Sequence, residues 1–205
     1  MRRQLTTIIT SIACFGTINT AHAGVSAELM FGNESSTLDT KYSGQLAPKT
    51  MFYARNRTTV DYENVVDIFF VGDVAYTLVD GLDAVAEVQT APGMGVVPRI
   101  GVEYFTQQND VLFYTEISGK ISENPNAELT LRFTYVPTLG KNISGFGQLE
   151  TITDVGINGH EWSTERVRLG IGSNGYNFGG AVDLTQVGNS MATTSSYGIF
   201  VGKKF

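Results

Sequence analysis

The sequence predicts an all-β protein: a transmembrane antiparallel up-and-down β-barrel that follows a cleaved signal peptide. Three observations lead to this prediction. The N-terminus has the pattern of a secretory signal, apolar and polar residues alternate with period two along most of the chain, and every arginine after residue 23 lies opposite an apolar face. Charged residues make up 17% of the 205 residues, which is below the roughly 25% usual for soluble domains.

The N-terminal segment is expected to be removed during export. A basic start is followed by mostly apolar residues 8–15 and then by Ala21-His22-Ala23, which matches the pattern before a signal-peptidase cleavage site. A lipoprotein signal that ends at Cys14 is the alternative. We therefore expect a signal peptide at 1–23 and one outer-membrane β-barrel at 24–205.

The alternation of apolar and polar residues predicts the strands. In 127–135, for example, Ala, Leu, Leu, Phe and Tyr share one face, and Glu, Thr, Arg and Thr share the other. Hairpin signals such as Asp80-Gly81 and Asn174-Gly175 separate such runs. Twelve strands result, with ten as the alternative count: about 24–32, 36–44, 49–62, 65–79, 83–91, 96–106, 110–119, 126–137, 142–153, 161–173, 176–187 and 193–205.

The positions of the basic residues favour a membrane barrel over a soluble sandwich. All six arginines that follow residue 23 fall mid-strand on the polar face, and the six lysines fall in or near turns and strand ends. A basic side chain that faces lipid at mid-bilayer costs roughly 2–4 kcal/mol. Lipid exposure would enforce this segregation, whereas the wet face of a sandwich, which is the alternative, would accept lysine anywhere.

An even number of strands places both termini on one side, which in bacterial barrels is the periplasmic side. The turns near 80–82, 107–109 and 174–175 are then periplasmic. On the lipid face, five aromatic residues fall at this rim and form a predicted girdle, as amphipathic rings do at the headgroup level. They are Tyr76, Tyr104, Tyr135, Tyr176 and Phe205.

The last strand resembles the C-terminal signature of Gram-negative outer-membrane β-barrel proteins. Tyr197, Ile199, Val201 and Phe205 alternate as that signature requires, and Lys203 departs from it. The resemblance implies a bacterial outer-membrane location and recognition of Phe205 by the barrel-assembly machinery. The strand count, the short turns and the inward arginines also resemble the small monomeric porins typified by oligogalacturonate-specific porins.

The polar faces predict a charged lumen. Its predicted pore-lining residues are Arg55, Arg57, Arg99, Arg132, Arg166, Arg168, Asp67, Asp73, Glu87, Glu103, Glu116, Glu128, Glu150 and Asp183. Such a lining would suit a porin-like channel for passive diffusion of small hydrophilic solutes. The alternative is a closed structural or surface-interaction barrel, in which the same groups pair and plug the interior.

Other functions are disfavoured by composition. The formal net charge of −6 argues against nucleic acid as a partner. The partners that we expect are outer-membrane lipid and a small solute. One cysteine and two histidines predict no metal site, and we expect no cofactor. After residue 23 the sole histidine is His160, expected in an outer loop, and Ser163 would lie on the opposite face of an extended chain. We therefore expect no catalytic residues and no enzyme activity.

Overall fold

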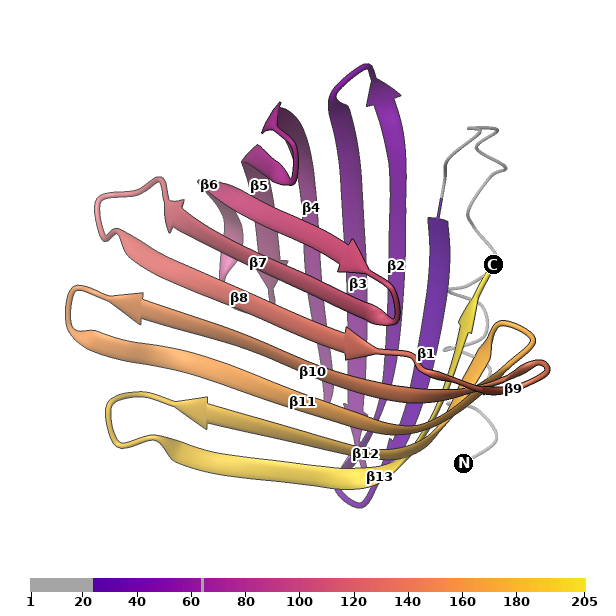
Figure 1. The fold of residues 1–205 in the computed structure, drawn as a ribbon. Coiled ribbons are helices and arrows are strands. Elements are labelled where there is room, and N and C mark those ends of the chain that lie inside the picture. The colour runs from indigo at the N-terminus through magenta and orange to yellow at the C-terminus, as the bar shows by residue number, and fades with distance from the viewer. Residues whose placement is uncertain (1–23, 64) are drawn as a thin grey trace.

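The computed structural model describes residues 24–63 and 65–205. They form a closed antiparallel barrel (Figure 1). The strands are β1 (Gly24–Gly32), β2 (Ser35–Ala47), β3 (Thr50–Asp61), β4 (Val66–Val79), β5 (Leu82–Ala91), β6 (Gly95–Gln108), β7 (Val111–Lys120), β8 (Asn126–Tyr135), β9 (Thr138–Gly140), β10 (Ile143–Gly156), β11 (Gly159–Ser173), β12 (Tyr176–Val187) and β13 (Ala192–Lys204). The predicted signal peptide lies outside the described residues. Within the described part of the chain, no helix is long and apolar enough to cross a membrane.

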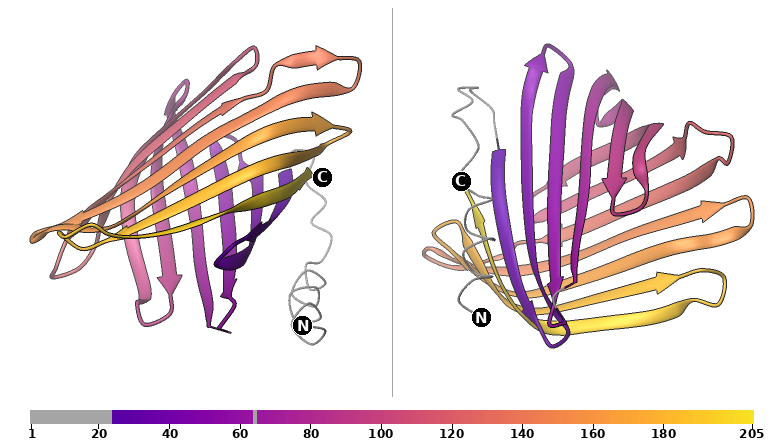
Figure 2. Two further views of the ribbon diagram at one scale, coloured as in Figure 1. Left: turned by 90° about the horizontal axis from the view of Figure 1, so that it is seen from below. Right: turned by 180° about the vertical axis from the view of Figure 1, so that it is seen from behind.

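The barrel closes where the first strand meets the last. β1 pairs with β13 from Ser26–Lys204 to Gly32–Gly198, and the other strands pair with their neighbours in sequence, except that β8 pairs with β10 and not with β9. β8 and β9 both pair with β10, so β9 continues β8 after a break at 136–137. The predicted all-β barrel of twelve strands is thus confirmed, with its eighth strand interrupted. Figure 2 shows the tilted wall from two further sides.

Both ends of the barrel follow from this pairing. The first residue of β1 and the last of β13 lie at one end, which we call the terminal end. The β4–β5 and β11–β12 turns are at this end too. They place Gly81, Asn174 and Gly175 at φ values of 78°, 51° and 79°, in the left-handed region that glycine and asparagine tolerate best. The sequence predicts that the terminal end faces the periplasm.

The loops at the opposite end, which we call the loop end, are shorter than predicted in one place. Residues 154–160 were expected to form an outer loop, but β10 runs to Gly156 and β11 begins at Gly159. Gly159 has a φ of 104°, which permits this tight connection. The expected loop position of His160 is therefore wrong: it lies in β11, and its Nδ1 is 2.9 Å from the carbonyl oxygen of Gly188.

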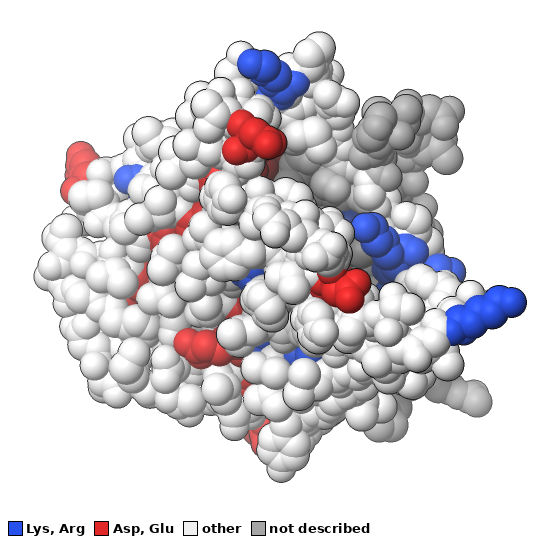
Figure 3. Space-filling model, in the orientation of Figure 1, with Lys and Arg blue, Asp and Glu red and all other residues white. Residues whose placement is uncertain are grey.

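The outward face of the barrel is apolar. Large side chains such as Ile100, Leu169 and Ile199 are 58%, 64% and 65% exposed. The pairing registers place two charged residues on this face among the described strands, Glu165 and Lys203. On the face seen in Figure 3, uncharged atoms likewise make up most of the surface. An apolar exterior with a charged interior is the reverse of a soluble sandwich and is the pattern of a membrane barrel.

Two backbones approach closely at the pair Gly170–Gly179 of β11 and β12. A Cβ added at Gly179 would lie within contact distance of the carbonyl oxygen of Leu169 and 2.6 Å from the Cα of Gly170. At the adjacent Gly180, an added Cβ would meet nothing within 4 Å. The first position therefore requires glycine, and the second does not.

We expect Gly179→Ala to lower the free energy of unfolding by about 1–3 kcal/mol, because the methyl group would force the two strands apart. Gly180→Ala is the matched control and should change it by less than about 0.5 kcal/mol. Equilibrium unfolding in urea of the barrel refolded into lipid vesicles measures both values. Equal stability of the two variants would contradict the close approach.

Candidate functional site in the barrel lumen

The lumen holds the charged side chains that the sequence assigned to it. All fourteen predicted lining residues lie at inward-facing register positions, on nine strands from β3 to β12. Asp67 is the outlying member, since it is exposed near the loop end of β4. Their part in a conducting pore stays a prediction. The structure divides them between two regions of the interior with different charge balance.

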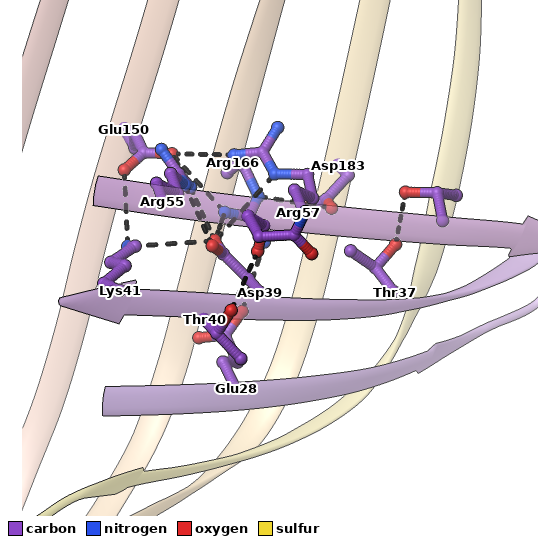
Figure 4. A network of polar contacts seen from close by, with 12 residues as sticks. Glu28, Thr37, Asp39, Thr40, Lys41, Arg55, Arg57, Glu150, Arg166 and Asp183 are labelled. Atoms are coloured by element: carbon purple, nitrogen blue, oxygen red, sulfur yellow. Dashed lines mark hydrogen bonds and ion pairs between the residues drawn. The ribbon is translucent and has the colours of Figure 1, made fainter. Parts of the chain in front are cut away.

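The first region is a compact cluster of ion pairs, which we call the charge network (Figure 4). Asp39 accepts two hydrogen bonds from Arg55, from Nε at 2.9 Å and from Nη2 at 2.6 Å. Arg168 Nη1 donates to Asp183 Oδ1 at 2.5 Å. The members are Glu28, Asp39, Lys41, Arg55, Arg57, Glu150, Arg166, Arg168 and Asp183.

The charge network crosses the interior of the barrel. Arg55 of β3 donates to Glu150 of β10 at 2.7 Å, and Arg166 of β11 donates to Asp39 of β2 at 2.6 Å. Neither pair of strands is adjacent in the sheet. Arg168 is 0% exposed and Glu150 is 1% exposed, so side chains fill the lumen at this level. Charges so buried need satisfied partners, because desolvation is costly.

Sequence reasoning missed two members of this network. Asp39 was not assigned to the lumen, and Lys41 was expected in or near a turn. The second expectation is wrong, because β2 extends to Ala47 and Lys41 points inward, 3.8 Å from both Asp39 and Glu150. Thr40, between Asp39 and Lys41, faces the lipid side and is itself polar. This segment therefore lacks the alternation of apolar and polar residues that marks the other strands. In the β2–β3 pairing Asp39 lies opposite Arg57, and Lys41 lies opposite Arg55. Because both arginines were assigned to the lumen, this pairing could have assigned Asp39 and Lys41 to it as well.

The second region is a cavity of about 350 Å³ beside the charge network, which we call the acidic cavity. Apolar side chains such as Val71 and Ile152 line part of it, and Arg132 lies at its edge, 5.2 Å from the Tyr114 ring centre. Carboxylates from five strands line the rest. Outside the charge network these are Asp73, Asp83, Glu87, Glu103, Glu116 and Glu128.

Arg99, which the sequence placed in the pore lining, is held beside this cavity. Its Nε donates to Ser118 Oγ at 3.0 Å, and its Nη1 donates to Asn126 Oδ1 at 3.0 Å. Glu87 and Asp154 lie 3.7 Å and 3.6 Å from its guanidinium nitrogens. At 2% exposed, Arg99 braces the β6–β7 wall and is closed off from water.

Two more features complete the interior and its rim. A further cavity of about 760 Å³ lies at the terminal end, among the turns and inward residues such as Leu112, Thr134 and Phe146. In the described part of the chain, no group of three or more His, Cys, Asp or Glu side chains could hold a metal ion.

The predicted girdle residues Tyr76, Tyr104, Tyr135, Tyr176 and Phe205 are all exposed, next to the terminal-end turns or at the chain end.

Comparison with known proteins finds similarity in structure alone. No family model matches the sequence, and no curated protein matches it. The KdgM porin in complex with disordered oligogalacturonate is similar with a TM-score of 0.51 and 12% identity, over 89% of this chain and 99% of that one. The NanC porin gives a TM-score of 0.54 and 10% identity, over 89% and 98% of the two chains.

A third similar structure corrects one expectation. LpxR from Salmonella typhimurium, a lipid A deacylase, matches with a TM-score of 0.51 and 8% identity, over 89% of this chain and 99% of that one. The prediction that this chain is not an enzyme, which rested on its single histidine after residue 23, is therefore wrong. An enzyme has the same barrel fold, so the scarcity of histidine does not exclude catalysis.

These similar structures are outer-membrane barrels, and the porins among them match the resemblance found in the sequence. At this level of identity the likeness concerns the fold. The predicted location in the bacterial outer membrane agrees with it. The chain has the closed twelve-stranded fold of the small outer-membrane porins.

Proposed function

We propose that the barrel is a channel for passive diffusion of small hydrophilic solutes, and that the charge network forms its narrowest level. The observation that carries the proposal is the open space in a polar lumen: cavities of about 350 and 760 Å³ lie among inward-facing residues of a twelve-stranded barrel. Barrels of eight strands fill with side chains, whereas those of 16–18 strands hold an aqueous channel. Twelve strands leave room for a narrow one.

The arginines favour a selective level within such a channel. Arg55 and Arg57 on β3 and Arg166 and Arg168 on β11 share carboxylates across the lumen. Asp39 and Glu150, for example, each contact Arg55 and Arg166. Opposed charges at one level set a transverse field that a passing solute must cross.

The same network favours the second candidate, a closed barrel without transport. Its central side chains are almost fully buried, with Arg168 0% and Glu150 1% exposed, so they leave little space at this level. In the low dielectric of a barrel interior, paired groups rigidify the fold, and a structural role would need nothing more. The two candidates differ in the conductance of the wild type. A channel conducts before the network is removed, whereas a closed barrel conducts only after its removal.

Planar-bilayer recording of the refolded barrel distinguishes them. We expect discrete conductance steps from the wild type, and larger steps from the double variant Asp39→Asn/Arg166→Gln, which removes one cross-lumen pair without changing net charge. Asp67→Asn is the control, because Asp67 faces the lumen but lies outside the network.

Three outcomes are informative. Larger steps from the double variant and unchanged steps from the control support the channel. A silent wild type beside a conducting double variant identifies the closed barrel. Identical steps from all three proteins would place the narrowest level elsewhere, and the proposed constriction would then be wrong.

A further inference from the structure

The acidic cavity contains like charges paired directly across strands. Asp73 lies opposite Glu87 in the β4–β5 register, Asp83 lies opposite Glu103 in β5–β6, and Glu103 lies opposite Glu116 in β6–β7. Like charges placed directly opposite each other destabilise a sheet. In the charge network the facing residues are instead of opposite sign, as in Glu150–Arg166 and Arg166–Asp183. The cavity thus concentrates negative charge, which Arg132 in its lining and Arg99, 3.7 Å from Glu87, balance only in part.

Two carboxylates of the cavity have oxygens without a partner. Gln89 Nε2 donates to Glu128 Oε1 at 2.8 Å, and the Tyr114 hydroxyl donates to Glu116 Oε2 at 2.6 Å. Both donors are neutral. The remaining oxygens, Glu116 Oε1 and Glu128 Oε2, are buried and have no hydrogen-bond partner, although their residues are only 6% and 5% exposed. Buried acceptors are nearly always satisfied in native proteins, so these two need an explanation.

Three arginines lie near these carboxylates. Arg132 lines the cavity itself, with its guanidinium over the Tyr114 ring, 5.2 Å from the centroid. Arg55 is held by Asp39 and Glu150. Arg99 is held by Ser118 and Asn126, and among the cavity carboxylates it forms an ion pair with Glu87 at 3.7 Å. Within the described residues, no basic side chain forms an ion pair with Glu116 or Glu128. A cation that enters the cavity would satisfy their free oxygens.

From these observations we propose that the acidic cavity binds an organic cation, of the class of alkyl amines and diamines. Each ammonium group carries three donors and would meet the free carboxylate oxygens. The methylene groups would pack against Phe69, Val71 and Ile152, which line the same cavity. A volume of about 350 Å³ is within the range of small-molecule sites. The site does not depend on whether the barrel conducts.

Binding to the purified barrel in detergent tests the proposal. The probe is 1,5-diaminopentane, followed by isothermal titration calorimetry at low salt. The uncharged 1,5-pentanediol and the dianion glutarate are the chemical controls, and MgCl2 is titrated separately. We expect saturable binding of the diamine and none of the diol or the dianion. Tighter binding of Mg²⁺ than of the diamine would overturn the choice of an organic cation.

The variant Glu116→Gln/Glu128→Gln removes both free charges with little change of shape. We expect it to bind the diamine at least about tenfold more weakly, because each lost charge also removes a charge-assisted hydrogen bond. The matched control Asp67→Asn faces the lumen but does not line the cavity. It should bind as the wild type does.

Folding of each variant is checked by the heat-dependent shift of its gel mobility and by circular dichroism. A folded double variant that retains full affinity would overturn the proposal, as would the absence of saturable diamine binding to the wild type. If the double variant fails to fold, the single variants Glu116→Gln and Glu128→Gln carry the test. Unchanged affinity in both would then contradict the site.

Discussion

Replacing Glu150 by alanine is expected to lower the free energy of unfolding of the barrel by about 3–5 kcal/mol, the usual cost of removing one partner from a buried ion pair. The Glu150 carboxylate accepts hydrogen bonds from Arg55 at 2.7 Å, Arg57 at 3.1 Å and Arg166 at 3.4 Å. It is also 3.8 Å from Lys41. Its loss would leave these cations with Asp39 as their shared acceptor at the centre of the lumen.

Urea unfolding of the barrel refolded into lipid vesicles measures this loss. Glu150→Gln should be destabilised less than the alanine variant, since its amide oxygen still accepts one guanidinium while the charge is gone. Glu123→Ala removes an exposed loop carboxylate and should cost less than about 0.5 kcal/mol. If Glu150→Ala and Glu123→Ala cost the same, water must enter the network freely, and the burial described above would be contradicted.

The sequence could predict the strands because one face of each is apolar. β1 and β12 have the expected bounds, and most other strands differ by a few residues at their ends. The interruption of the eighth strand was missed, although Pro137 marks it. Proline has no backbone N–H to donate to the ladder, and here its carbonyl oxygen accepts from Gly145 instead.

The contacts across the lumen could not be predicted in the same way. Period two tells which face a residue occupies, but it does not tell which residue of the far wall it meets. That Arg55 meets Glu150, 95 positions along the chain, depends on the tilt and stagger of the whole barrel. The pairing of Asp39 with Arg57 was within reach, because it needs only the short β2–β3 turn.

Replacing Ile100 by arginine is expected to lower the free energy of unfolding by about 2–4 kcal/mol, the cost of a basic side chain on the lipid face near mid-bilayer. Ile100 lies near the middle of β6, faces outward and is 58% exposed. In a water-soluble sheet the same substitution at so exposed a position would change stability by less than about 0.5 kcal/mol. The size of the effect therefore reports which solvent covers this face.

Leu139→Arg is the matched control for that comparison. Leu139 is 63% exposed, close to the value for Ile100, but it lies in β9 beside the terminal-end turn. An arginine there can extend to the headgroup region, and we expect a cost of no more than about 1 kcal/mol. The two substitutions are chemically similar and equally exposed, so a difference between them must arise from depth in the bilayer. If the cost at Ile100 were as low as the cost expected at Leu139, the lipid-facing wall would be contradicted, because water would then have to cover Ile100.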